Sequence, residues 1–428
     1  MISSPLHVGI DLGTSGCRAM AIDQNLEAVA SAATDLPPPQ RHGTGSEQDA
    51  EIWWQAVREV LGELTGRIDP GAIRAIAVDG TSGSIVLCDD SGSPLAPALL
   101  YNDARAREEA ARIAEAAPPV SGAHGASSGL AKLLYLQDHA DGRRAGHVLN
   151  QAEWIAARLT GRYGMGDENN CLKLGYDVVA RRWPDWLDEL GVNRAWLPEV
   201  VAPGTPLGPV IPAVRQQFGL AADCRVMAGT TDSIAAFLAT GASQAGEAVT
   251  SLGSTLVLKI LATQPVFAPQ HGVYSHRLGG WWLAGGASNS GGAVLRHYFT
   301  QSELDTLTPQ LDPGHPTALD YYPLLAPGER FPSCDPQLPP RLTPRPPAAA
   351  RFFQGMLEGM ARIEARGYRL LAELGAPSPV SVRSVGGGAG NAAWTRIRAR
   401  ELQVPMLESR HNEAAYGAAL LAAGRLPS

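Results

Sequence analysis

Two turns rich in glycine and hydroxyl side chains are the segments best suited to bind phosphate. Each joins two short apolar runs, which is the pattern of a β-hairpin. The first turn, at 13–16, follows LHVGIDL, and the second, at 253–255, follows GEAVTSL. Backbone N–H groups in such turns can hold an anion, although most turns of this composition only reverse the chain. Their shared Leu-Gly-(Thr/Ser)-(Ser/Thr) pattern predicts an internal duplication, with one hairpin opening each of two lobes.

A third glycine-rich segment, GGGAGN at 386–391, lies between a strand-like segment, SVRSV, and a helical one, AAWTRIRAREL. The first turn of a helix offers unpaired N–H groups to an anion, and glycines let a ligand approach the backbone closely. The chain contains neither a Walker A motif nor a G-x-G-x-x-G motif after a strand. Each turn alone is a weak signal. The three turns in this order are more specific, and they resemble the arrangement of actin-like ATPases.

Asp232 is the best candidate for a general base. It follows the strand-like segment CRVMAG and begins the apolar helical segment SIAAFLA. A carboxylate in this position could accept a proton from a substrate hydroxyl. It could equally cap the helix, which is a common role of Asp. The residues alone leave both interpretations open.

Alternating helical and strand-like segments must position these residues. Helical periodicity marks 49–65, 103–116 and 150–160, while the apolar runs 72–80 and 224–229 are typical of strands. This alternation predicts an α/β chain. The Pro-rich stretch that follows in the second half predicts an irregular surface connection, because a strong helical pattern comes directly after it.

The length of the chain predicts two lobes. With about 150 residues per domain as a guide, 428 residues exceed one ordinary core. We expect the boundary near residue 228, which gives an N-terminal lobe over 1–228 and a C-terminal lobe over 229–428.

Charge and cysteine content narrow the class of protein. The formal net charge is −7 and no run of Lys or Arg exceeds two residues, which argues against a nucleic-acid partner. The N-terminal residues lack the pattern of a signal peptide, and the apolar runs are shorter than the ~20 residues that span a bilayer. The five cysteines form no C-x-x-C pair and predict free thiols in a reducing compartment. We therefore expect a soluble cytoplasmic protein with no membrane partner.

Along nearly its whole length the chain resembles the FGGY family of carbohydrate kinases. VGIDLGTSG (8–16) is similar to the family's first phosphate loop. SEQDAEIWW (46–54) is similar to its Glu-Gln-Asp-Pro-Glu-x-Trp-Trp segment, with Ala50 in place of proline, and EWIAARLTG (153–161) to a helix that begins with Asp rather than Glu153. Four more segments follow in family order: GTTDSIAA (229–236), SLGST (251–255), GERFP (328–332) and GGGAGN (386–391).

Within the family, several segments resemble the members that phosphorylate D-ribulose. These are GTSG (80–83), LKLGY (172–176), GASNSGG (286–292) and LDYYPL (319–324). The resemblance implies ATP-dependent phosphorylation of D-ribulose to D-ribulose 5-phosphate. A D-xylulose kinase or another FGGY polyol kinase is the alternative, and a non-sugar actin-like ATPase is an alternative of a different class.

The resemblance also implies a fold, a cofactor and partners. The expected fold is α/β, with two actin-like (ribonuclease H-like) lobes and an active-site cleft between them. The expected cofactor is Mg²⁺ with ATP. The expected partners are a small ketose and ATP, with a homodimer left open.

The resemblance assigns site residues one by one. Asp232 matches the family's catalytic base. Asp11 is expected to hold Mg²⁺ through water, and tying down the turn at Gly13 is its alternative role. The substrate set is Asp11, Gly80, Thr81, Ser82, Gly83, Asn102 and Asp232. The nucleotide set is Gly13, Thr14, Ser15, Ser251, Gly253, Ser254, Thr255, Ser288, Gly386, Gly387, Gly388, Ala389, Gly390 and Asn391.

The segment YNDAR (101–105) resembles the family's Trp-x-Asp-x-Arg. Tyr101 stands where the family has the tryptophan that serves as an aromatic platform for the sugar. Asp103 and Lys173 are further candidates for the sugar pocket, and the sequence leaves their roles open.

Overall fold

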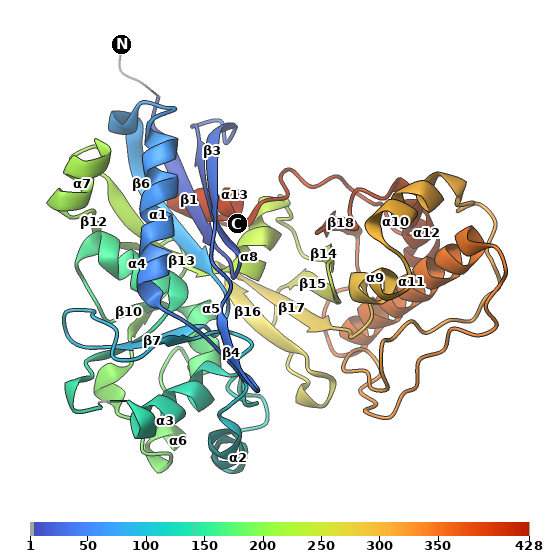
Figure 1. Cartoon of the computed structure of the whole chain (residues 1–428), viewed down its shortest axis with the longest axis horizontal. Coiled ribbons are helices and arrows are strands. Elements are labelled where there is room, and N and C mark those ends of the chain that lie inside the picture. The colour runs from blue at the N-terminus through green and yellow to red at the C-terminus, as the bar shows by residue number, and fades with distance from the viewer. Residues whose placement is uncertain (1–3, 141, 428) are drawn as a thin grey trace. The chain divides into compact units, whose positions relative to one another are not determined.

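A computed structural model of the protein describes residues 4–140 and 142–427, and these divide into two compact units (Figure 1). Unit 1 contains the described residues up to Ala239, together with Arg277–Gly279 and Glu413–Leu426. Unit 2 contains Thr240–His276, Gly280–Asn412 and Pro427. The division thus falls after Ala239 rather than near 228, because the strand before Asp232 pairs within the sheet of unit 1. Asp232 consequently belongs to unit 1.

The main sheet of unit 1 has six strands in the order β12-β13-β6-β1-β2-β3. The pairs β1–β6 and β6–β13 are parallel, whereas β1–β2, β2–β3 and β12–β13 are antiparallel. The strand bounds are β1 Leu6–Leu12, β2 Gly16–Ile22, β3 Ala28–Asp35, β6 Ile73–Gly80, β12 Pro206–Pro209 and β13 Arg225–Thr231.

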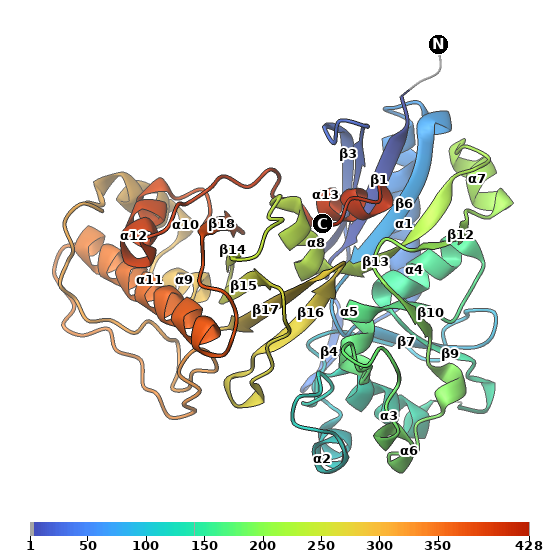
Figure 2. The same cartoon turned by 180° about the vertical axis from the view of Figure 1, so that it is seen from behind.

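Helices cover both faces of this sheet. Alternate residues of a strand point to opposite faces. Val8 and Ile10 of β1 therefore pack in the core with α1 (Ala50–Thr65) and α4 (Gln151–Thr160). Gly9 faces α13 (Ala414–Ala422), where an added Cβ would lie 2.0 Å from the carbonyl oxygen of Ala415. Figure 1 shows α1 and α4, and Figure 2 shows α13 beside β1.

Unit 1 also contains a five-stranded sheet in the order β4-β5-β8-β7-β9, which packs with α2 and α3 around a separate apolar core. Its strands are β4 Gln40–His42, β5 Gly45–Gln48, β7 Ile85–Cys88, β8 Ala98–Leu99 and β9 His147–Asn150. A two-stranded pair joins β10 Met165–Asp167 to β11 Glu199–Val201. The other helices are α2 Arg107–Ala116, α3 Gly129–His139, α5 Glu168–Cys171, α6 Trp186–Glu189, α7 Pro212–Phe218 and α8 Asp232–Ala239.

Unit 2 is built on a five-stranded sheet in the order β16-β17-β15-β14-β18. Its strands are β14 Glu247–Leu252, β15 Leu256–Ala262, β16 Tyr274–Leu278, β17 Trp281–Ala287 and β18 Ser381–Val385. The last two residues of β16, Arg277 and Leu278, are part of unit 1. Its helices are α9 Gly292–Tyr298, α10 Gln301–Leu307, α11 Ala349–Glu373 and α12 Ala392–Leu402. The long helix α11 packs its apolar face, including Phe352, Met356 and Met360, into the core beneath the sheet.

The structure confirms the predicted hairpins and most predicted helices. The hairpins are β1–β2 and β14–β15, and the three turns join the elements expected. The helix expected over 103–116 starts later, at Arg107. The buried Asp103 carboxylate accepts hydrogen bonds from the Ser46 and Arg105 N–H groups, which holds this segment outside the helix.

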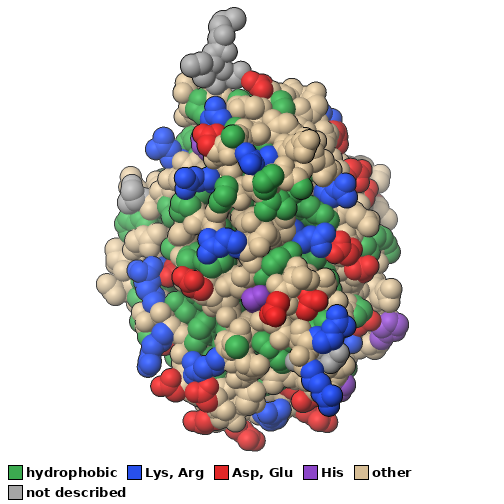
Figure 3. All heavy atoms as spheres, turned by 90° about the vertical axis from the view of Figure 1, so that its left-hand side faces the viewer, with side chains coloured by type: hydrophobic (Ala, Val, Ile, Leu, Met, Phe, Trp, Pro, Cys, Tyr) green, Lys and Arg blue, Asp and Glu red, His purple; other side chains and the backbone are tan. Residues whose placement is uncertain are grey.

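The thiols and the surface agree with the composition. All five cysteines are free, and Cys334 is exposed while the others are buried. Within residues 4–140 and 142–427, no helix combines the length and apolarity that a membrane crossing needs. On the face drawn in Figure 3, basic and acidic side chains are interspersed.

Candidate active site

Three carboxylates meet at one edge of the main sheet of unit 1. Asp11 and Asp79 lie opposite each other near the carboxyl ends of β1 and β6. Asp232 follows Thr231, the last residue of β13, which lies opposite Gly80. Ligands of open α/β sheets bind at the carboxyl ends of parallel strands. The topology therefore brings together Asp11 and Asp232, which were predicted, and Asp79, which was not.

Burial and mutual repulsion set the charge of this carboxylate cluster. Burial, with a further contribution from Asp232, raises the pKa of Asp11 to about 6. Burial and the charges of Asp11 and Asp232 raise the pKa of Asp79 well above its usual range. Arg18 Nη1 lies 3.6 Å from Asp11 Oδ2 but is half exposed, so it offsets this effect only in part. The cluster therefore favours either a shared proton or a bound cation.

The donor set fits a hard divalent cation. Within the described part of the chain, the buried Asp79 carboxylate receives no N–H or hydroxyl donor and can share a proton only with the Asp11 carboxyl group. Mg²⁺ prefers carboxylate oxygens. Within that same part, no three acidic, His or Cys side chains are spaced to enclose a metal. Mg²⁺ commonly binds through one or two carboxylates, with water and phosphate oxygens completing its shell, and this sparse arrangement suits that mode.

Asp232 begins α8 and accepts a hydrogen bond from the Ser233 N–H at 2.6 Å through Oδ1. This contact is local to the helix start. A carboxylate has capacity for several hydrogen bonds, so it can accept this one and still take up a proton from another group. The geometry accommodates both roles considered for Asp232.

The turn after β6 carries the predicted sugar residues. Thr81 donates its N–H and its hydroxyl to Gln151 Oε1 at 3.0 and 2.7 Å. The Ser84 N–H donates to the Thr81 carbonyl, and Gly83 has a φ of +90°, the pattern of a type II turn. The Thr81 hydroxyl is thus engaged within the protein, whereas the Ser82 hydroxyl has no hydrogen-bond partner among the described residues.

Two buried oxygens beside this turn lack partners. They are Ser82 Oγ and Asn102 Oδ1, and neither has a hydrogen-bond partner in the described structure. Leaving a buried polar group unpaired is costly. Both atoms were predicted to contact the substrate, and a polar ligand would satisfy them.

Asp103 fastens the 101–105 segment. Its fully buried carboxylate pairs with Arg105, whose Nη2 lies 2.8 Å away and also contacts Glu47 at 2.6 Å. Tyr101 is 43% exposed, and its N–H donates to Ser84 Oγ at 2.9 Å. These contacts of Asp103 hold in place the backbone on which the neighbouring Asn102 lies.

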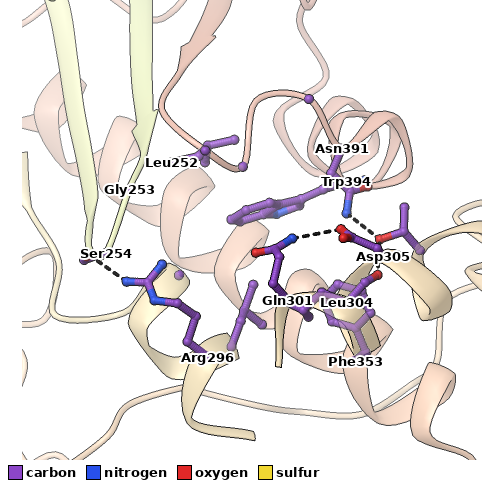
Figure 4. A pocket seen from close by; sticks show the side chains of 16 residues that line it. Leu252, Gly253, Ser254, Arg296, Gln301, Leu304, Asp305, Phe353, Asn391 and Trp394 are labelled. Atoms are coloured by element: carbon purple, nitrogen blue, oxygen red, sulfur yellow. Dashed lines mark hydrogen bonds between the residues drawn. The ribbon is translucent and has the colours of Figure 1, made fainter. Parts of the chain in front are cut away.

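Unit 2 contains a cavity of about 580 Å³. The β14–β15 turn, α9, α10 and the 386–391 segment surround it (Figure 4). Its lining residues are Leu252, Gly253, Ser254, Gly292, Leu295, Arg296, Gln301, Leu304, Asp305, Thr308, Phe353, Gly387, Gly388, Gly390, Asn391 and Trp394. The size lies within the usual range of small-molecule sites.

The cavity is lined by a cationic side chain near the hairpin turn and by an aromatic ring elsewhere. Arg296 donates to the Ser254 hydroxyl at 2.8 Å, beside the hairpin turn. Trp394 presents its ring to the cavity (Figure 4), and its buried indole N–H has no partner in the described structure. Asn391 Oδ1 accepts a hydrogen bond from the backbone N–H of Trp394, and Asn391 Nδ2 donates to the Thr308 hydroxyl. A cationic group near a turn and an aromatic wall suit the phosphates and the base of a nucleotide.

The predicted nucleotide residues fall into several groups. Six of them line the cavity: Gly253, Ser254, Gly387, Gly388, Gly390 and Asn391. Ser251, Thr255, Gly386 and Ala389 belong to the same two segments but do not line it. Gly13, Thr14 and Ser15 form the β1–β2 turn of unit 1, next to Asp11.

Ser288 is fully buried and donates its hydroxyl to Glu329 at 2.6 Å. It lies outside the lining of the cavity.

Sequence reasoning missed Arg296 and Trp394. Each lies in a helix that directly follows a glycine pair or a glycine-rich segment, and this was the available signal.

Comparisons with known proteins place the first boundary at the same residue, Ala239, whereas their second domain also includes the C-terminal helix α13, which packs in unit 1. Residues 6–239 match the model of the N-terminal domain of the FGGY family of carbohydrate kinases, and residues 248–425 match the C-terminal domain. The xylulose kinase of Escherichia coli K12 is 27% identical over 421 residues, covering 92% of this chain and 84% of that protein. The xylulose kinase of Streptomyces coelicolor is 29% identical over 443 residues, covering 99% and 88%.

A solved structure shares the fold. It is a kinase from Brucella ovis, described as a xyloylose kinase, and it is 26% identical with a TM-score of 0.88. The match covers 98% of this chain and 90% of that one.

Proposed function

The chain belongs to the FGGY family of carbohydrate kinases, which are ATP-dependent phosphotransferases, and on that premise we propose that it phosphorylates a five-carbon ketose. The observation that carries this proposal is the carboxylate cluster Asp11, Asp79 and Asp232, in the same unit as the unpartnered Ser82 and Asn102 oxygens. Phosphoryl transfer to an alcohol needs alignment, charge neutralisation and a base for the hydroxyl proton.

We assign the base to Asp232, whose carboxylate takes the proton of the attacking hydroxyl. Asp11 would hold Mg²⁺ through water, and the ion would neutralise charge on the phosphates. The cavity of unit 2 would bind the nucleotide, with Arg296 facing the phosphates and Trp394 facing the base. ATP as donor, together with five free thiols, supports a cytoplasmic location.

Two observations bear on the identity of the ketose, and they favour different sugars. The relatives named above are xylulose kinases, which favours D-xylulose over the D-ribulose expected from the sequence motifs. The small hydroxyl side chains of Thr81 and Ser82 keep D-ribulose as the second candidate. These two sugars differ only in the configuration at C3, so a single hydrogen bond to the C3 hydroxyl is enough to distinguish them.

ADP release with D-xylulose, D-ribulose, ribitol, glycerol and D-ribose tests this proposal. We expect the highest kcat/KM with one of the two ketoses, and with D-xylulose first. A preference for glycerol or D-ribose over both ketoses would refute the assignment of a ketose. ADP release that is independent of any sugar would favour an actin-like ATPase instead.

Replacing Asp11 should change the response to the metal. We expect Asp11→Asn to raise the Mg²⁺ concentration for half-maximal activity about tenfold, because the carboxylate charge is lost. Activity measured over a Mg²⁺ titration shows this shift, and Asp223→Asn, an exposed change in the same unit, is the control. An unchanged Mg²⁺ response in Asp11→Asn would leave Asp11 only the role of tying down the turn.

A further inference from the structure

Lys132 is a fully buried lysine in unit 1 that no part of the proposed chemistry uses. It lies on α3, and its Nζ donates to the Gly83 carbonyl at 2.5 Å and to the Leu100 carbonyl at 2.8 Å. Burial and the neighbouring Lys173 lower its pKa to about 7, against an opposing effect of Asp103. Burying an ammonium group without an ion pair is costly. We therefore expect the two carbonyl contacts of Lys132 to serve a role beyond packing.

The two carbonyls belong to the two segments that carry the unpartnered oxygens. Gly83 follows Ser82 in the turn after β6, and Leu100 lies two residues before Asn102. A single ammonium group thus fixes the distance between these segments. The hydrogen bond from the Tyr101 N–H to Ser84 Oγ is a second link between them.

Lys173 holds the same turn from another side. Its Nζ donates to the Ser82 carbonyl at 3.0 Å, and its Cδ would lie 3.1 Å from a Cβ added to Gly83. Turns of types I and II differ in the orientation of the central peptide, which here joins Ser82 to Gly83. The bond from Lys173 to the Ser82 carbonyl therefore fixes this peptide in the type II orientation.

We propose that Lys132 and Lys173 form a two-lysine clamp that positions the sugar site. The clamp orients Ser82 Oγ and Asn102 Oδ1 toward one polyol ligand. Both lysines act through the backbone, so they are positioning residues for sugar recognition. The inference deepens the proposed function and rests on it. Lys132 lies in none of the family-like segments described above, whereas Lys173 lies in LKLGY (172–176).

The clamp predicts a selective loss of sugar affinity. Lys132→Met and Lys173→Met remove the ammonium donors and keep most of the side-chain volume. We expect each to raise the KM of the preferred ketose about tenfold or more, with the KM of ATP within about twofold of wild type, because nucleotide contacts are untouched. Calorimetric titration with the same ketose should show a matching loss of affinity.

Leu133→Ala is the matched control. Leu133 is the next residue on α3 and is buried in the separate core of this region, so its truncation lowers stability without touching the turn. We expect a lower Tm in Leu133→Ala with both KM values unchanged. A purely structural role of Lys132 would make the two variants behave alike.

The outcomes separate the clamp from the proposed function. Unchanged ketose KM in the lysine variants, or an equal rise in Leu133→Ala, overturns the clamp alone. If Lys132→Met fails to fold, Lys173→Met decides, because Lys173 is only partly buried. Absence of ketose turnover by the wild-type enzyme overturns the proposed function, and the clamp with it.

Discussion

Asp232→Asn is expected to lower turnover by about 10²- to 10⁴-fold, while the affinities for sugar and ATP change little. The substitution is almost isosteric and removes basicity. The amide oxygen can still accept the Ser233 N–H, which Asp232 Oδ1 binds at 2.6 Å. The start of α8 should therefore keep its hydrogen bond, so that Tm stays close to that of the wild type. Steady-state rates and calorimetric binding measure the two effects separately.

Asp49→Asn makes the same change at another helix start. Asp49 caps α1 and accepts the Glu51 N–H at 3.0 Å, so it reports the effect of an Asp-to-Asn change on a cap. We expect this control to retain wild-type turnover. Near wild-type turnover in Asp232→Asn would remove Asp232 from the mechanism and leave it the role of a cap.

Gly387→Val is expected to weaken ADP binding by about 100-fold or more, because the new side chain would occupy the nucleotide cavity. Gly387 lines the cavity of about 580 Å³. An added Cβ there meets no atom within 4 Å, so the fold should tolerate the change. Calorimetric titration with ADP measures the loss, and affinity for the ketose should persist.

Gly280→Val serves as the control for this substitution. Gly280 also lies in unit 2 and also has open space around an added Cβ, but it is outside the lining of the cavity. We expect it to bind ADP as the wild type does. If Gly387→Val bound ADP equally well, the nucleotide site would have to lie elsewhere.

Local patterns were sufficient to predict the elements and turns. The hairpin β1–β2 follows from two apolar runs around Gly13 and Gly16, and Asn391 marks the start of α12 in the sequence as it does in the structure. Helix α1 follows from apolar residues such as Trp53 and Val57 at helical spacing. These features depend on residues close together in the chain, so the sequence displays them directly.

Tertiary contacts explain what the sequence could not predict. Asp79 joins the carboxylate cluster only because β1 and β6 pair in parallel register. Lys132 lies 49 residues from Gly83 and 32 from Leu100, and no local pattern links them. The domain division likewise depends on β13 pairing with β6 and on α13 packing beside β1, contacts between distant parts of the chain.

The most direct test of the account is the stoichiometry of the reaction with a ketose. Wild-type enzyme would be incubated with ATP, Mg²⁺ and either D-xylulose or D-ribulose, and the products followed by phosphorus NMR. We predict one sugar phosphate for each ADP formed, with ADP formation dependent on the sugar. ADP and inorganic phosphate accumulating without sugar phosphate, at a rate unaffected by either ketose, would contradict the central claim.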